Sequence, residues 1–145
     1  MKALMKKHLK NQKGLTLIEL LAVVVILGII AAIAIPSIGA IIDNTRKDAH
    51  IANAEQMVNS VKTAVATNVG DGKEYTLKQL VDAGLIENPE VPGKGGKYDE
   101  GTVEIATSGT NKTYTVTLDG YIVNKTITTL RGNGTGEGRA AVNLN

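Results

Sequence analysis

An uninterrupted apolar segment near the start of the chain limits its possible folds more than any other feature. No side chain between Leu20 and Ile35 is polar. In the wider segment 15–42 the polar side chains are Thr16, Glu19 and Ser37. A helix of roughly 20 apolar residues is long enough to span a bilayer. The sequence therefore predicts one membrane-spanning helix, followed by a folded part over residues 43–145.

Charge is divided unevenly around the apolar segment. Residues 1–14 carry five lysines and no acid, whereas residues 15–145 carry 14 acids and 11 bases and have a net charge of −3. Basic residues next to a span stay on the cytoplasmic side, so we predict a single-pass precursor with a cytoplasmic N-terminus. A net negative body has no electrostatic footprint for nucleic acid, so Lys94, Lys97 and Lys112 give DNA only weak support as a partner.

Two ordinary interpretations fit a basic start followed by an apolar segment. One is a secretory signal peptide, with Ala32-Ile33-Ala34 resembling a cleavage site, and the other is an uncleaved membrane anchor. Glu19 argues against both, because an ionised carboxylate within a span costs about 2.5–3.5 kcal/mol on insertion scales. Either interpretation would leave a secreted or membrane-anchored small domain with an unknown binding role as the alternative.

The stretch KGLTLIELL, residues 13–21, resembles the processing site of type IV prepilins and of the pseudopilins of type II secretion and competence systems. The resemblance lies in a basic leader, Gly14, an apolar residue, Thr16 and Glu19, all ahead of a helix-length apolar run. It implies that a prepilin peptidase cleaves after Gly14 and N-methylates the new terminus, Leu15, which stands where the family usually has Phe. The leader would be residues 1–14, and residues 15–42 would form the transmembrane and filament-core half of the helix.

The resemblance also gives Glu19 a role in assembly. In a filament, the carboxylate of one subunit would pair with the Leu15 amine of its neighbour and set the axial stagger between them. Such a pair is stronger in an apolar interior than in water. Pro36 removes an intrahelical hydrogen bond, so helical order should weaken between Gly28 and Pro36, with Gly39 just beyond. A filament helix that melts there and a simple membrane-helix kink are compatible interpretations.

Beyond Ile42 the helix becomes amphipathic and is predicted to continue to about Val69, where Gly70-Asp71-Gly72 stops it. Its apolar stripe is Ile51, Ala54, Val58, Val61, Ala64 and Val65. Thr76 and Gln79 form a capping-box pattern that opens a short helix ending near Gly84. Residues 75–86 also resemble a stretch common in pilin-like proteins of Gram-positive bacteria.

Strands are predicted in the second half of the folded part, after a loop over residues 88–101. They lie near residues 102–107, 113–118 and 121–128. Asp119-Gly120 is a two-residue hairpin signal that would pair Leu118 with Tyr121 and Val116 with Val123. The glycine-rich tail from Arg131 is predicted to be mobile, or to become ordered only in an assembly. The fold class is therefore α+β, with the long N-terminal helix of the lollipop-shaped pilin fold packed on a small antiparallel sheet in the head.

The chain shows no catalytic, metal or cofactor constellation. It has no cysteine, which excludes disulfides and thiolate metal sites, and it has two histidines, His8 and His50. His50 shows no partner residues and is predicted to be solvated or interfacial. Residues 93–97 are rich in glycine and lysine but lack the spacing of a phosphate-binding loop. We therefore predict no enzymatic activity, no metal and no cofactor.

Together these features predict a structural subunit of a type IV pilus-like filament. The expected partners are copies of the chain, minor pilins, prepilin peptidase, the cytoplasmic membrane, and a membrane platform protein with its assembly ATPase. The precursor would lie in the cytoplasmic membrane and the product in a cell-surface filament. Major pilin, minor pilin and pseudopilin remain equally open, as do adhesion, motility, DNA uptake and secretion.

Overall fold

The computed structural model describes residues 2–132 and 137–144, and it divides into two compact units, Met1–Ile41 and Ile42–Asn145. The elements are α1 (Lys2–Ala66), β1 (Glu74–Thr76), α2 (Leu77–Asp82), β2 (Gly101–Ser108), β3 (Asn111–Leu118), β4 (Ile122–Thr126), α3 (Ile127–Arg131) and α4 (Glu137–Ala140). The four strands form one antiparallel sheet in the order β1-β2-β3-β4. A long helix followed by an antiparallel sheet confirms the predicted α+β class. We call the unit Ile42–Asn145 the head.

Helix α1 ends slightly earlier than the pattern predicted. It stops at Ala66, and the chain leaves it through Asn68, whose φ of 56° is left-handed. The amide of Val69 donates to the carbonyl of Ala64 at 2.9 Å, so the last turn is closed by backbone hydrogen bonds. The glycines at positions 70 and 72 therefore follow the helix end and do not cause it.

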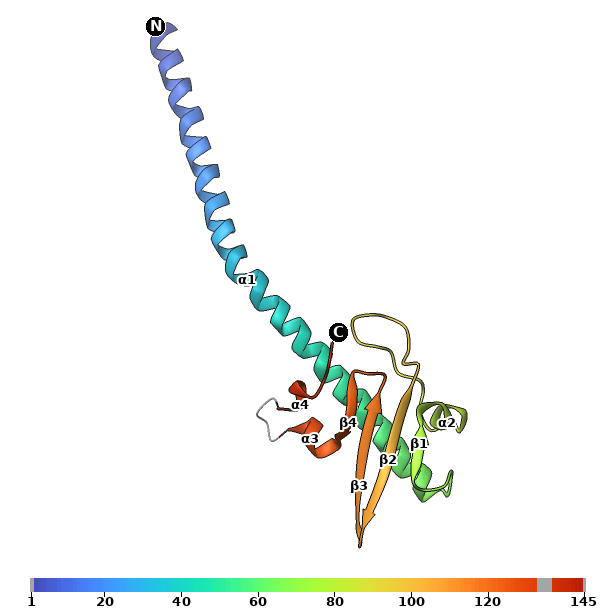
Figure 1. The fold of residues 1–145 in the computed structure, drawn as a ribbon. Helices are drawn as coiled ribbons and strands as arrows, with labels where there is room; N and C mark the ends of the chain where they lie inside the picture. Colours follow the sequence, from blue (N-terminus) through green and yellow to red (C-terminus); the bar gives the residue numbers. More distant parts are fainter. Residues whose placement is uncertain (1, 133–136, 145) are drawn as a thin grey trace. The chain divides into compact units, whose positions relative to one another are not determined.

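The second half of α1 packs on one face of the sheet and supplies much of the core of the head (Figure 1). The predicted stripe is confirmed, because four of its residues are buried and the other two are partly buried against them. The buried ones are Ala54, Val58, Val61 and Ala64, and the partly buried ones are Ile51 and Val65. From the other elements the core takes mainly aliphatic side chains, together with Tyr75 and Tyr98.

The capping box was predicted correctly. The amide of Gln79 donates to Thr76 Oγ1 at 3.2 Å, and the amide of Thr76 donates to Gln79 Oε1 at 3.0 Å. The chain leaves helix α2 through Gly84, whose φ is +67°. The three predicted strands are confirmed as β2, β3 and β4. The short strand β1 was missed, because three residues are too few to show an alternating pattern.

The predicted pairing across the last hairpin was wrong. Leu118 faces Ile122 and Val116 faces Lys125, with a register shift between them. Asp119 has the left-handed backbone that the turn requires, but the amide of Tyr121 donates to the carbonyl of Leu118 at 2.9 Å and places Tyr121 in the loop. Asn124, with φ of 48°, accommodates the extra residue as a bulge.

The prediction of a mobile tail from Arg131 was also wrong for the residues that the structure describes, whereas Gly134 and Gly136 lie outside them. Two ion pairs hold this segment on α1. Arg131 Nε lies 2.8 Å from Glu55 Oε1, and Arg139 makes two contacts of 2.7 Å with the carboxylate of Asp48. A bridge between Ile122 and Val142 adds the chain's end to the sheet. Glycine-rich composition misled the prediction because these contacts are all long-range.

Candidate assembly surface

The described side chains of the unit Met1–Ile41 present an exposed apolar surface. Every large apolar side chain from Leu17 to Ile41 is more than half exposed. By length and composition, the described helix from Thr16 to Ala66 can cross a membrane, and none of its most apolar window is buried. A helix that is apolar on all sides is stable only in lipid or among other apolar helices. This surface is therefore stable only when a bilayer or other apolar helices surround it.

Glu19 is the one charged side chain between Thr16 and Ile42, and it is exposed within this apolar surface. The backbone of α1 carries Gly14 and Leu15 in the turn before it. A separation of four residues places Leu15 and Glu19 on the same side of the helix, about 6 Å apart along its axis. The arrangement offers one carboxylate for charge pairing where all its neighbours are apolar.

Helix α1 remains helical through Gly28, Pro36 and Gly39. Apart from the adjacent residues and the backbone of the surrounding helical turns, no atom of the described chain lies within 4 Å of the position that a β-carbon would occupy on Gly28 or on Gly39. Neither glycine is therefore required by a close contact inside the chain. Weakened helical order in this region stays a prediction.

The prediction that His50 is solvated or interfacial was wrong. Its ring is fully buried, 2.6 Å from the Tyr98 hydroxyl through Nδ1 and stacked on Tyr121 with ring centroids 4.2 Å apart. Nε2 has no hydrogen-bond partner among the described residues. His50 precedes Ala54, Val58 and Val61 at helical spacing, so the apolar stripe itself was the signal that could have placed it in the core. Its role is structural packing at the start of the head.

This environment predicts a pH-dependent stability. Burial, and to a lesser extent the positive charge of Lys94, lower the pKa of His50 below its usual value of 6.5. The unfolded chain thus binds the proton more readily. The contribution of neutral His50 to the free energy of unfolding is present above pH 6.5 and is lost as the pH falls below that value. For one proton, the loss is no more than about 1.4 kcal/mol per pH unit.

Thermal unfolding of the full-length protein in detergent between about pH 7.5 and 5 measures this loss. Among the groups that contact the ring, burial raises the pKa of Tyr98 to about 12. Two residues before His50 on α1, Asp48 accepts a hydrogen bond from Arg139. This bond lowers the pKa of Asp48 and keeps it ionised. His50→Gln should flatten the pH dependence. An equal slope in both proteins would contradict the assignment.

The three lysines that were considered as a DNA-binding site do not lie together on the head. Lys94 lies 5.4 Å from the Tyr121 ring centroid, next to the end of β3, whereas Lys112 is near the start of that strand. The strand length separates them by about 20 Å. The described residues also contain no group of three His, Cys, Asp or Glu side chains that could hold a metal ion.

Sequence reasoning missed a cavity in the head that brings Lys112 together with Lys62 of α1. The Lys62 ammonium lies 5.4 Å from the centroid of the Tyr114 ring. No local pattern indicates this cavity, because its two lysines are 50 residues apart in sequence and meet only through tertiary packing.

Comparison with known proteins identifies relatives over about 59–70% of the chain. The family described as Prokaryotic N-terminal methylation motif matches residues 9–35. A Fimbrial protein of Pseudomonas aeruginosa is 37% identical over 113 residues, which cover 70% of this chain and 71% of the relative. A Type IV major fimbrial protein FimA of Dichelobacter nodosus is 39% identical over 119 residues, covering 69% and 73%. Another FimA from that organism is 46% identical over 97 residues, covering 59% and 60%.

The comparison with solved structures gives no match. The relatives are named as fimbrial proteins, which are structural, and this agrees with the prediction that the chain is not an enzyme. The resemblance of residues 75–86 to Gram-positive pilin-like proteins stays a prediction. The matched motif spans Gly14, Leu15 and Glu19, together with most of the exposed apolar surface.

Proposed function

The chain belongs to the type IV pilin family, and on this premise we propose that prepilin peptidase cleaves it after Gly14 and N-methylates Leu15. The mature chain is a structural subunit of a pilus and assembles with other pilin copies into a filament. The observation that carries the proposal is a methylation motif over residues 9–35 that coincides with an exposed apolar helix. Cleavage at Gly14 removes the five leader lysines and retains that helix.

The apolar half of α1 then serves twice. In the membrane-anchored precursor, lipid covers the side chains from Leu17 to Ile41, and in the surface filament the same side chains are covered by the helices of neighbouring subunits. The two environments are similarly apolar, so transfer between them is driven by packing and by specific pairing. We infer that residues 15–42 are the membrane and filament-core segment, and that residues 43–145 form the head.

Specific pairing is the role that we propose for Glu19. In the bilayer its carboxylate is an unfavourable group in an apolar surface, and a cationic amine on Leu15 of a neighbouring subunit would satisfy it. Each partner removes the other's desolvation penalty, provided that the geometry is good. Because each chain carries one such carboxylate among apolar residues, the pair fixes one axial register between neighbours.

The remaining partners follow from the energetics of assembly. Moving an apolar helix out of a bilayer costs on the order of several kcal/mol before filament contacts form. The chain has no phosphate-binding motif of its own. We therefore propose that a platform protein and an assembly ATPase supply the work, that minor pilins join the filament, and that the precursor's N-terminus is cytoplasmic. Gly28, Pro36 and Gly39 are where we propose that helical order loosens in the filament.

The test of this proposal is the intact mass and N-terminal sequence of the protein sheared from cells. A chain that begins at Leu15 and is heavier by one methyl group is the expected result. A chain that begins near Ile35 or Ala40 would instead indicate a conventional signal peptide, because Glu19 would have been removed with it.

A further inference from the structure

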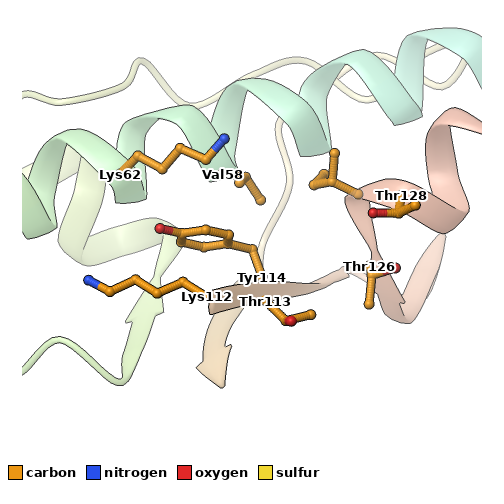
Figure 2. A pocket seen from close by; sticks show the side chains of 8 residues that line it. Val58, Lys62, Lys112, Thr113, Tyr114, Thr126 and Thr128 are labelled. Atoms are coloured by element: carbon orange, nitrogen blue, oxygen red, sulfur yellow. The ribbon is translucent and has the colours of Figure 1, made fainter. Parts of the chain in front are cut away.

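A cavity on the head lies between the second half of α1, the start of β3 and the beginning of α3. Its volume is about 250 Å³. It is lined by Val58, Lys62, Lys112, Thr113, Tyr114, Thr126, Ile127 and Thr128. Figure 2 shows the Tyr114 ring between the side chains of Lys62 and Lys112, which come from α1 and β3. The lining thus combines two ammonium groups, three threonine hydroxyls and a tyrosine.

This cavity has an uncompensated positive charge. No acidic residue lines it, and neither Lys62 nor Lys112 forms a salt bridge with another described residue. Lysine ammonium groups and hydroxyls both donate hydrogen bonds, and a carboxylate only accepts them. The ligand that fits this lining is therefore a small acidic group, of the size of one or two side chains.

The head carries the complementary charge elsewhere on its own surface. Residues 71–104 hold eight acids and four bases, a net charge of −4, whereas residues 105–145 hold four bases and two acids, a net charge of +2. Asp99 and Glu100 stand immediately before β2, are exposed, and form no salt bridge with a described residue. Together with Asp119, whose amide donates to the carbonyl of Glu100 at 3.1 Å, they form an acidic group at this end of the β2–β3 pair.

The register of the sheet places Asp99 and Glu100 at one end of the β2–β3 ladder and the lysine-lined cavity at the other end. Gly101 faces Leu118 at one end, and Thr107 faces Lys112 near the other. Six residues of extended strand separate the ends by about 20 Å. The acids and the cavity of one head therefore cannot meet each other, but those of two heads can.

We propose that the lysine-lined cavity receives Asp99 and Glu100 of a second copy of this chain. The inference rests on the proposed function, because it concerns contacts between subunits of the filament. A contact between two different patches of the head is heterologous, and repetition of such a contact generates an open helical filament when the rotation between copies does not close a ring. Charge pairing between heads would thus act together with the helix core and select the neighbour's orientation.

Charge reversal tests the contact in the full chain, expressed where no wild-type copy is present. Lys62→Glu with Lys112→Glu is expected to reduce the yield of sheared filaments about tenfold, because like charges then face each other. Asp99→Lys with Glu100→Lys is expected to do the same. Combining all four substitutions in one chain makes neighbouring copies complementary again and should restore the yield. Failure of that rescue, with each pair alone still harmful, would overturn the proposal.

Lys73→Glu with Lys78→Glu is the matched control, because these exposed lysines lie just before β1 and in α2 and the net charge changes by the same amount. Normal yield is expected from the control. An equal loss would show that net charge, and not the cavity, determines the result, and would overturn the proposal.

A cross-link distinguishes this inference from the proposed function itself. The chain has no cysteine, so Lys112→Cys with Glu100→Cys introduces the only thiols. Their α-carbons are too far apart to join within one chain. Oxidised filaments should give a ladder of covalent multimers, whereas Lys112→Cys with Lys73→Cys should not. Filaments without a ladder would overturn the head contact alone, and a chain that never enters filaments would overturn the proposed function.

Discussion

Replacing Glu19 with Ala is expected to abolish filament formation while leaving cleavage at Gly14 and membrane insertion intact. The substitution removes the one charged group from an otherwise apolar surface, so insertion becomes easier and not harder. It also leaves the methylated amine of the neighbouring Leu15 without its partner in an apolar interior. An uncompensated buried charge costs about 3–5 kcal/mol, which corresponds to a loss of more than a hundredfold in the assembly equilibrium.

Two variants sharpen this experiment. Glu19→Asp keeps the charge and shortens the side chain, so partial filament yield is expected, and Glu104→Ala removes an exposed acid of the head and should leave the yield unchanged. The measurements are the amount of protein in sheared filaments and the processed fraction in membranes. Filaments of normal yield and helical symmetry from Glu19→Ala would remove the register role.

Replacing Gly14 with Val is expected to leave the chain in the membrane as unprocessed precursor. A protease must bring its catalytic groups close to the scissile backbone, and a β-branched side chain at that position blocks the approach that glycine allows. The five leader lysines then stay attached, and no free amine forms on Leu15. Filament yield should therefore fall to the detection limit.

The matched control is Gly28→Val on the same helix, where the new β-carbon would lie within 4 Å of nothing beyond the adjacent residues and the backbone of the surrounding turns. Its cleavage should be normal whatever happens to its assembly. Quantitative mass spectrometry of the membrane fraction gives the ratio of precursor to mature chain. A wild-type ratio for Gly14→Val would show that the processing enzyme does not act at this bond.

Sequence reasoning predicted those parts of the fold that depend on residues close together in the chain. The capping box of Thr76 and Gln79 needs three residues of separation, and the stripe of α1 needs a regular period. The hairpin register failed because Tyr121 is drawn into the turn, where it stacks on His50, a residue 71 positions earlier in the printed sequence. A local turn rule contains no information about that partner.

The candidate assembly residues were proposed for a different reason. Gly14, Leu15 and Glu19 lie within one short segment, residues 9–35, which matches the N-terminal methylation motif. The cavity around Lys62 and Lys112 could not be predicted in this way, because it depends on how α1 crosses the sheet (Figure 2). The tail was wrongly predicted to be mobile because the ion pairs that stabilise it join it to α1, which is far away in the sequence.

Those ion pairs also bear on the order of folding. Arg139 and Asp48 are separated by 91 positions, and Arg131 and Glu55 by 76, so neither pair can form until the chain has been made as far as these arginines. Contacts of such long range form late in folding, after the local helices and hairpins. On the proposed topology, the apolar half of α1 would be in the bilayer before Arg131 and Arg139 have crossed it. Translation and translocation of these two arginines would then time the completion of the head.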